Sequence, residues 1–412
     1  MNTEEEYGRR LLGPLVEEPT APSRIDLSQA MTSGRRRRRT RQAVATTGLL
    51  AVATAAVISL PMVIQRVSAN QAEPGASGSA SAVASPAVSP SPAAPRYDRG
   101  GAPALPTACK ATAFPSPGGG HSYVRAVDPT GHWAAYRTYI NGTNAKIWHD
   151  GKVDAVKMPG EDNGFEAINS AGVAVGQTFV GEAGSNAMVY RDGGVAKLPG
   201  GVGAAPSGIN DDGVIVGEKD HKPIVWRAAT SRPEPLPMPE GFTWGQANDI
   251  DDDGTIVGHV SDGTGGSRVA YVWLPSGKGK ALPAPVLDGV TANDFDARKV
   301  TNGWVSGYAT FAGKEANSVR WDLATGKVEA FAKLQWSNDV NAYGWMTGMS
   351  DKNRAVLTDG TTYVVLEEIF PIYQEYGMNF GESMSDDGRV IVGQNDDGAH
   401  DGVQRALLWR CS

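Results

Sequence analysis

A nine-residue pattern of apolar and polar positions recurs along the C-terminal three quarters of this chain. An apolar residue is followed by Asn, Asp or Ser, two variable positions, Gly, two mostly apolar positions, a small or β-branched residue, and Gly. Three clear copies occupy 168–176, 209–217 and 250–258, and they end 41 residues apart. Less regular copies end at positions 135, 307, 348 and 393. Seven copies at nearly constant spacing predict a repeat array.

Each unit predicts four short strands. The first strand precedes the Asn or Asp, whose side chain can hydrogen-bond to the backbone two residues on, and the Gly accepts a left-handed conformation before the second strand. A third strand ends near an aromatic residue, and a fourth follows a short turn. Five of the ten tryptophans stand at the end of the third strand: Trp148, Trp226, Trp273, Trp321 and Trp409.

Four strands in a unit of this length, apolar on both faces, are typical of a β-propeller blade. We therefore expect an all-β fold, a seven-bladed β-propeller of four-stranded repeats of about 41 residues. A β-helix is the structural alternative, but its coils are usually shorter and it needs no closure.

The two ends of the repeat region predict how the ring closes. The last unit stops without its outer strand, and residues 109–115, which precede the first unit, have the pattern of that missing strand. Aligning both with the first unit places Cys109 on Val153 and Cys411 on Asp150, the ends of a four-residue turn. The Cα atoms at the ends of such a turn lie less than about 7 Å apart. These are the only two cysteines, so we expect a disulfide that closes the propeller.

An uncharged segment near the N-terminus predicts a membrane anchor. Residues 43–64 are long enough to span a hydrocarbon core of about 30 Å as one helix. Six arginines in 35–41 precede the segment and only Arg66 follows it closely, which predicts a cytoplasmic N-terminus and an extracellular C-terminal part. A signal peptide cleaved after Ala69 is the alternative, although the leader and the apolar run are long for one. Both readings export the repeats.

The chain therefore divides into four predicted parts. Residues 1–42 form a basic, disordered cytoplasmic tail, 43–64 the transmembrane helix, 65–106 an extracellular stalk rich in Ala, Ser and Pro, and 107–412 the propeller. The stalk has too little apolar bulk to offset its chain entropy. We expect the protein in a bacterial cell membrane, in contact with lipid through one helix, and as a monomer.

Charge and motifs limit the possible chemistry. Residues 1–66 contain ten Arg and six acidic residues, so they carry +4 and the remainder carries −11 of the total of −7. An acidic propeller disfavours nucleic-acid binding. The six histidines lack metal-site spacing, and no nucleophile elbow, Walker loop or Rossmann glycine loop occurs, so the sequence assigns no catalytic residue.

Residues 109–411 resemble the HAF family of probable extracellular repeats. The resemblance rests on the Ile-Asn-x-x-Gly-x-x-Val-Gly pattern and on the strand that ends in Trp, whereas the His-Ala-Phe tripeptide is replaced by runs such as Ala-Met-Val at 187–189. The resemblance implies an extracellular repeat domain and no particular activity.

Loops that enter the first strands and loops that join the second and third strands are expected on one face. Aromatic residues followed by polar ones fall there, a combination that suits carbohydrate or peptide contact. The alternative is that the aromatic residues fill gaps between blades. The candidate binding residues are Phe165, Glu166, Trp244, Asn248, Trp336, Asn338, Phe380 and Glu382.

One turn has the beginning of a calcium loop. Asp249, Asp251 and Asp253 alternate before Gly254, but no Glu stands at the position that completes such a loop. A polar turn without a cofactor is the alternative that we favour, and Ca²⁺ is the one cofactor with any support.

These features favour an extracellular interaction module that binds a cell-surface glycan or a protein. A propeller enzyme that acts on a glycan or lactone, with two carboxyl groups as acid and base, is the first alternative. A structural spacer at the cell surface is the second.

Overall fold

The computed structural model describes residue 97 and residues 99–139, 143–181, 184–263, 265–312, 316–370, 379–397 and 403–412. The predicted cytoplasmic tail, the predicted transmembrane helix at 43–64 and most of the predicted stalk lie outside these residues. Within them, no helix has the length and apolar character needed to cross a membrane.

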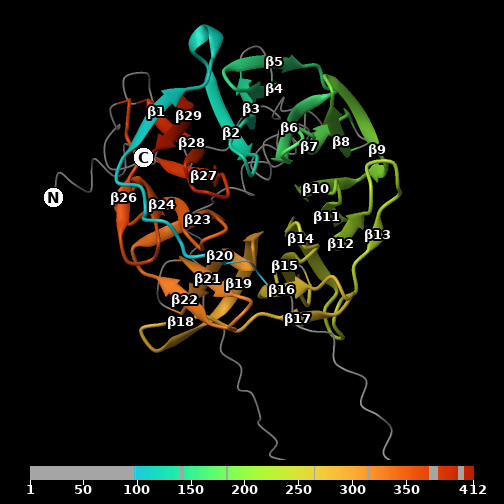
Figure 1. Cartoon of the computed structure of the whole chain (residues 1–412). Coiled ribbons are helices and arrows are strands. Elements are labelled where there is room, and N and C mark those ends of the chain that lie inside the picture. The colour runs from blue at the N-terminus through green and yellow to red at the C-terminus, as the bar shows by residue number, and fades with distance from the viewer. Residues whose placement is uncertain are drawn as a thin grey trace, which may run out of the picture. The chain divides into compact units, whose positions relative to one another are not determined.

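Seven antiparallel sheets stand around a common axis and form the predicted seven-bladed β-propeller (Figure 1). Blade 1 contains β2 (His121–Val127), β3 (Trp133–Tyr139), β4 (Thr143–His149) and β5 (Lys152–Val156). Blade 2 contains β6 (Glu161–Ile168), β7 (Ala174–Phe179), β8 (Ser185–Arg191) and β9 (Gly194–Val202). Blade 3 contains β10 (Ala204–Ile209), β11 (Ile215–Lys219), β12 (Lys222–Trp226) and β13 (Glu234–Pro235). Blade 4 contains β14 (Trp244–Ile250), β15 (Ile256–Ser261), β16 (Val269–Trp273) and β17 (Gly279–Ala281).

The remaining blades follow the same order, from the innermost strand to the rim. Blade 5 contains β19 (Val290–Thr301), β20 (Trp304–Phe311), β21 (Asn317–Asp322) and β22 (Val328–Phe331), with the short β18 (Val286–Leu287) added beside β19. Blade 6 contains β23 (Leu334–Val340), β24 (Met346–Ser350), β25 (Ala355–Thr358) and β26 (Tyr363–Val365). Blade 7 contains β27 (Phe380–Met384), β28 (Val390–Asp397), β29 (Val403–Cys411) and β1 (Cys109–Ala113), and a 3-10 turn, η2 (Pro117–Gly119), leads from β1 to β2.

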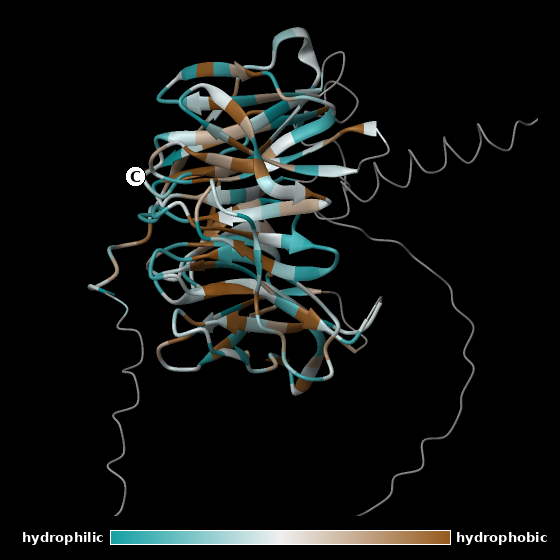
Figure 2. Ribbon diagram, turned by 90° about the vertical axis from the view of Figure 1, so that its right-hand side faces the viewer, coloured by the Kyte–Doolittle hydropathy of each residue, from teal (hydrophilic) through white to brown (hydrophobic). Residues whose placement is uncertain are grey.

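The innermost strands define two sides of the ring. We call the side on which they begin the entry side, and the side of the Asn-x-x-Gly turns that follow them the turn side. The contact surface between two neighbouring blades is called a seam. Clusters of buried apolar side chains fill the seams; one of them joins Val257 and Val272 of blade 4 to Phe295 and Trp321 of blade 5. Figure 2 shows hydrophobic residues recurring along the strands of the stacked blades.

The repeated polar residue of the turn has two structural roles. The Oδ1 of Asn169 accepts hydrogen bonds from the backbone N–H groups of Ala171 and Val173, at 3.2 and 3.0 Å. Its Nδ2 donates to the carbonyl of Asn210 in the next blade at 3.0 Å. Asn210 repeats the second bond, to Asp251 at 3.2 Å. The predicted side-chain bond within the turn is thus confirmed, and the same side chain also links successive blades.

The final glycine of the pattern is required by a bulge in the innermost strand. A Cβ on Gly258 would lie 1.9 Å from the carbonyl oxygen of Gln246, and one on Gly348 would lie 1.7 Å from that of Trp336. No side chain fits this approach, which explains why the glycine recurs. In blade 1 the predicted counterpart of this glycine is Ala135. The turn of blade 1 is longer, so Tyr136 stands opposite Val124, the residue before the bulge, and Ala135 pairs with Ala126.

Third-strand tryptophans fix the outer parts of the seams. Their side chains are almost fully buried, and in four of the five the indole N–H donates to a carbonyl at the outer edge of the preceding blade. The bonds measure 2.7 to 3.0 Å and join Trp226 to Pro199, Trp273 to Pro237, Trp321 to Pro283 and Trp409 to Glu367.

The ring closes as predicted. β1 pairs antiparallel with β29, and the disulfide Cys109–Cys411 joins two directly opposed residues whose Cα atoms are 4.0 Å apart. The predicted alignment was two residues out of register, because Trp409 faces Ala111 where Trp148 of blade 1 faces Val153. Cys109 therefore stands directly opposite Cys411 instead of at the far end of a turn.

Phe114 completes this closure on the side of blade 1. It is buried, and its ring centroid lies 4.8 Å from that of Tyr136 and 5.9 Å from that of Trp148. The last strand to join the ring is therefore held by a backbone ladder, a disulfide and an aromatic contact across the seam to blade 1.

Candidate binding site along the propeller axis

All seven innermost strands bulge at the same place, two residues before their last apolar residue. Each bulge residue is polar, although buried apolar residues stand close by in the strand. Neighbouring blades bring these side chains together around the axis, and we call the set the bulge ring. It consists of Arg125, Glu166, Ser207, Asn248, Arg298, Asn338 and Glu382.

Arg125 is the centre of the charged part of the bulge ring. Its Nε donates to Oε2 of Glu166 and its Nη1 to Oε1 of Glu382, both at 3.0 Å. The side chains of Arg125 and Glu382 are only 10% and 9% exposed. Burial, together with the nearby Glu166 carboxylate, raises the pKa of Glu382, and Arg125 limits the rise. Three blades thus place two carboxylates on one guanidinium.

The network continues through blades 6 and 5. Asn338 donates to Oε2 of Glu382 at 3.2 Å, and the Tyr308 hydroxyl donates to Oδ1 of Asn338 at 2.6 Å. The guanidinium of Arg298 lies 4.5 Å from the centroid of the Tyr308 ring, at cation–π distance. Glu166, Asn338 and Glu382, predicted as binding residues, therefore belong to one cluster.

Two other members of the bulge ring, Ser207 and Asn248, form hydrogen bonds between neighbouring blades. Ser207 and Asn248 each donate to the carbonyl that precedes the bulge of the next blade, at 2.6 Å to Ala247 and 2.6 Å to Ala297. Asn248, the fourth predicted polar residue, therefore has a structural bond. Its side chain is not part of the Arg125 cluster.

The four predicted aromatic residues divide into two pairs. Phe165 and Phe380 are only 3% and 8% exposed, so they pack inside the propeller instead of lining a surface. Trp244 and Trp336 are partly exposed and lie on the entry side of the bulge, as the first residue of β14 and the third residue of β23. Trp244 stacks on His221, with ring centroids 3.6 Å apart. The side chains of Trp244 and Trp336 are thus the two predicted aromatic groups that remain partly exposed on the entry side.

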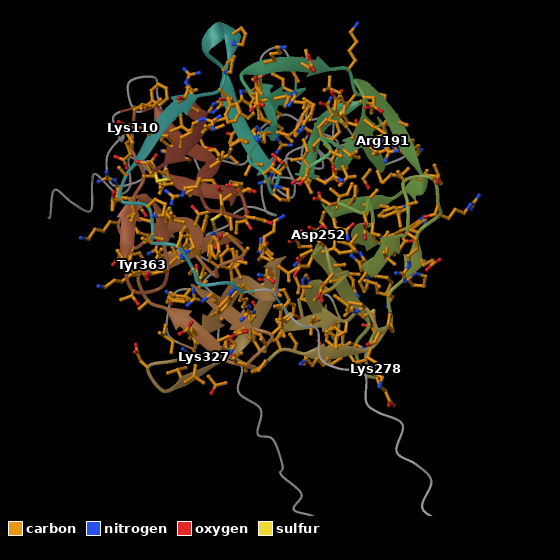
Figure 3. All side chains as sticks on the ribbon, in the orientation of Figure 1. Lys110, Arg191, Asp252, Lys278, Lys327 and Tyr363 are labelled. Carbon is orange, nitrogen blue, oxygen red and sulfur yellow. A yellow bond between two sulfur atoms is a disulfide. The ribbon has the colours of Figure 1, made fainter. Side chains whose placement is uncertain are left out.

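A cavity of about 80 Å³ lies on the turn side of the bulge ring and is lined by residues of all seven blades. Six aspartates and one lysine contribute to its wall: Asp211, Asp249, Asp251, Asp252, Asp339, Asp386 and Lys299. We call it the acidic cavity. Figure 3 shows Asp252 toward the centre of the ring, whereas Lys110, Arg191, Lys278 and Lys327 lie at its rim.

Carboxyl groups in the acidic cavity hold their protons more firmly than usual. Burial raises the pKa of Asp339 to about 6. Burial and the nearby carboxylate of Asp252 raise the pKa of Asp386 to about 7. The Lys299 Nζ lies 3.4 Å from Asp249 and limits the rise in the pKa of Asp249 and of Asp339, but burial outweighs its effect on both groups.

The three aspartates of the calcium prediction have separate partners. Asp249 accepts from the Val300 N–H at 3.0 Å, Asp251 from the Gly303 N–H at 3.1 Å, and Asp253 from the Thr255 N–H at 2.7 Å. In the part of the chain that the structure describes, no three His, Cys, Asp or Glu side chains are grouped to hold a metal ion. Calcium binding stays a prediction.

Arg125, Arg298 and Tyr308 are functional candidates that were not predicted from the sequence. A signal for the first two exists, because the column two residues before the last apolar residue of each first strand is polar in every repeat. Tyr308 directly follows the final glycine of the pattern, where the residue type varies from repeat to repeat, so it has no such signal.

Comparison with known proteins finds similarity in fold alone. No protein-family model matches the chain, and no curated protein sequence does either, so the HAF-type assignment stays a prediction. TolB from Acinetobacter baumannii is similar at 13% identity and a TM-score of 0.39, over 70% of this chain and 79% of that one. An acylaminoacyl peptidase from Pyrococcus horikoshii, at 16% identity and 0.40, and a GH74 xyloglucanase from Xanthomonas campestris, at 13% and 0.38, each match over 60% of this chain and 44% of theirs.

Proposed function

We propose that the propeller is the binding head of a membrane-tethered cell-surface protein, and that a glycan binds on the entry side of the bulge ring. The observation that carries the proposal is the Arg125 cluster, in which Glu166, Glu382 and Asn338 from three further blades are held in fixed orientations. Such side chains offer charged and neutral hydrogen-bonding groups to sugar hydroxyls, and Trp244 and Trp336 supply aromatic faces near them.

Matched tryptophan variants test the proposal. Trp244→Ala and Trp336→Ala should each weaken binding to purified cell-wall glycan at least tenfold in a pull-down or calorimetric titration, with little loss of thermal stability. Trp133→Ala is the control, because Trp133 stacks on His149 at the same 3.6 Å but lies on the turn side. Equal effects of Trp244→Ala and Trp133→Ala on glycan binding would contradict the proposal.

The tethered location is supported by two features. The chain has an uncharged segment at 43–64 behind a basic flank, and a disulfide joins the ends of the propeller. Disulfides persist mainly in exported proteins. Protease added to spheroplasts should remove the propeller and leave a small membrane-bound N-terminal fragment. A mature protein that begins at Asn70 and is free in the medium would support a cleaved signal peptide instead.

Glycan hydrolysis is a second candidate function, favoured by one observation. Glu382 is buried and has a raised pKa next to a second carboxylate, Glu166, an arrangement from which an acid and a base can be formed. Release of reducing ends from cell-wall glycan, abolished by Glu382→Gln, would establish the enzyme. Binding without such turnover would leave the interaction module as the function.

A further inference from the structure

A segment from the predicted stalk lies against the turn side of the propeller. We call residues 97 and 99–106 the strap; it runs from the region of β20 to β1 (Figure 1). At one end, Tyr97 and Arg99 contact blade 5, and at the other, Leu105 packs beside the apolar cluster of blades 6 and 7. Residues 100–104 between them are exposed. Tyr97 and Arg99 therefore form an anchor of their own.

Arg99 makes three kinds of contact with blade 5. Its Nη1 lies 2.5 Å from Oδ1 of Asp322, and its Nε donates to the Asn302 carbonyl at 3.2 Å. Its guanidinium lies 4.2 Å from the ring centroid of Trp304. The side chains of Arg99 and Asp322 are 20% and 10% exposed. A planar guanidinium suits such a combination of carboxylate, carbonyl and aromatic face, whereas a lysine does not.

Tyr97 fills a position that a tryptophan fills in three other seams. In blade 5, Trp304 covers the turn glycine of blade 6, Gly344, and in blade 6, Trp345 covers Gly388 of blade 7. Trp133 of blade 1 covers Gly172 of blade 2 in the same way. A Cβ on any of these three glycines would lie 2.7 Å from the tryptophan ring. An aromatic side chain from the preceding blade thus closes these seams on the turn side.

Blade 4 lacks this aromatic residue, as do blades 2, 3 and 7. The position after its turn glycine is Thr255, which is too small to cover Gly303 of blade 5. The Tyr97 ring lies there instead, 2.5 Å from where a Cβ on Gly303 would be. Burial raises the pKa of Tyr97 to about 12, and the Asp253 carboxylate contributes. The strap therefore supplies from outside the repeats what the blade itself does not contain.

We propose that the seam between blades 4 and 5 is a peptide-recognition site for an aromatic–x–arginine motif, and that the chain's own Tyr97 and Arg99 fill it. Thr255 and Gly303 form the aromatic subsite, and Asp322, the Asn302 carbonyl and Trp304 form the arginine subsite. The site fixes the point at which the N-terminal part of the chain leaves the propeller, on the turn side. The inference does not rest on the proposed glycan binding.

The test uses the full-length chain with Tyr97→Ala and Arg99→Ala. A fluorescent peptide with the sequence of residues 95–101 (Pro-Arg-Tyr-Asp-Arg-Gly-Gly) is titrated into it, and anisotropy is measured. The double variant should bind this peptide at least tenfold more tightly than a peptide with Ala in place of Tyr and the second Arg. The unaltered chain should bind it at least tenfold more weakly than the double variant, because its own strap competes. Arg227→Ala, which changes an exposed arginine paired with Glu234, should behave like the unaltered chain.

A double variant with unchanged near-ultraviolet circular dichroism that fails to bind the peptide would overturn the proposal. Equal binding by the unaltered chain would do the same. If the double variant does not fold, the single variant Arg99→Ala is used instead. The rate of chymotrypsin cleavage after Tyr97 is then compared between this variant and the unaltered chain. Cleavage at least tenfold faster than in the unaltered chain supports the arginine subsite, and an unchanged rate contradicts it.

Discussion

The two sides of the bulge ring contain similar acidic groups in different electrostatic settings. At the ring itself, Glu166 and Glu382 share the guanidinium of Arg125 at 3.0 Å. In the acidic cavity, six aspartates share the single cation Lys299 among the lining residues. At the ring, Arg125 limits the rise that burial causes in the pKa of Glu382, whereas in the cavity burial raises the pKa of Asp339 to about 6 and that of Asp386 to about 7. The ring therefore holds its carboxylates in fixed positions, whereas the cavity contains carboxyl groups that titrate near neutral pH.

Removal of Arg125 should have the largest effect on this comparison. Arg125→Ala leaves two largely buried carboxylates without their shared cation, so we expect a loss of about 3–5 kcal/mol in the free energy of unfolding. Urea denaturation at pH 7 measures it. Arg227→Ala, at an ion pair whose members are 63% and 60% exposed, is the control and should cost less than about 1 kcal/mol. Similar losses in the two variants would mean that the Arg125 cluster contributes no special stabilisation.

Removal of the disulfide should weaken the Arg125 cluster before the rest of the propeller. The reason is that the Arg125–Glu382 ion pair crosses the seam between blades 7 and 1, next to the closing pair of strands β1 and β29. Replacing Cys109 and Cys411 by Ser removes the disulfide across a sequence separation of 302 residues. We expect a loss of about 2–5 kcal/mol, measured by chemical denaturation. Hydrogen exchange should rise in β2 and β27 more than in β10 and β14. A uniform rise over all seven innermost strands would contradict this assignment.

The raised pKa of Asp386 in the acidic cavity should make the free energy of unfolding depend on pH. The folded-state pKa of Asp386, about 7, is above the usual value of 3.8, so its contribution is favourable at low pH and is lost as the pH rises from about 4 to 7. Asp386→Asn should therefore stabilise the protein at pH 8, by about 1–3 kcal/mol, and have little effect below pH 4. Thermal unfolding of both proteins at a series of pH values checks this. A variant that is less stable than the unaltered protein at pH 8 would show that the cavity compensates its charges.

The smallest stability change should come from the exposed aromatic residue of the entry side. Trp244→Ala removes one stacking contact with His221 at the surface, and we expect a loss of about 1 kcal/mol or less. Truncation of a buried aromatic residue costs about 3–5 kcal/mol, and Phe165→Ala should therefore be the contrast. If Trp244→Ala proved as destabilising as Phe165→Ala, Trp244 would be a packing residue and the entry side would lose one of its aromatic surfaces.

Repetition explains why most of the fold was predictable. The turn asparagine, the turn glycine, the close-approach glycine and the third-strand tryptophan each satisfy one physical requirement that recurs in almost every blade, so the seven-bladed ring follows from their spacing. The disulfide pairing was predictable from the missing strand. Its register was not, because β1 and β29 lack the connecting turn that fixes register in the other blades.

The site was less predictable, because it depends on bulges and on contacts across seams. A bulge changes which neighbours of a residue face the axis, so Glu166 and Glu382 join the cluster while Phe165 and Phe380 are buried. The anchor at Tyr97 and Arg99 was not predicted, because both residues lie in the stretch 65–106 that was assigned to the stalk on its composition. Tyr97 can lie over Gly303 because blade 4 has the small Thr255, and no tryptophan, after its turn glycine.

Hydrogen exchange of the full-length protein with purified cell-wall glycan fragments tests the central claim most directly. The account predicts slower exchange at the beginnings of the innermost strands and at the bulge ring, around Trp244, Trp336 and Arg125. It predicts no change in the Asn-x-x-Gly turns, such as residues 128–131 and 251–254. Protection confined to those turns, or none at saturating glycan, would contradict binding on the entry side.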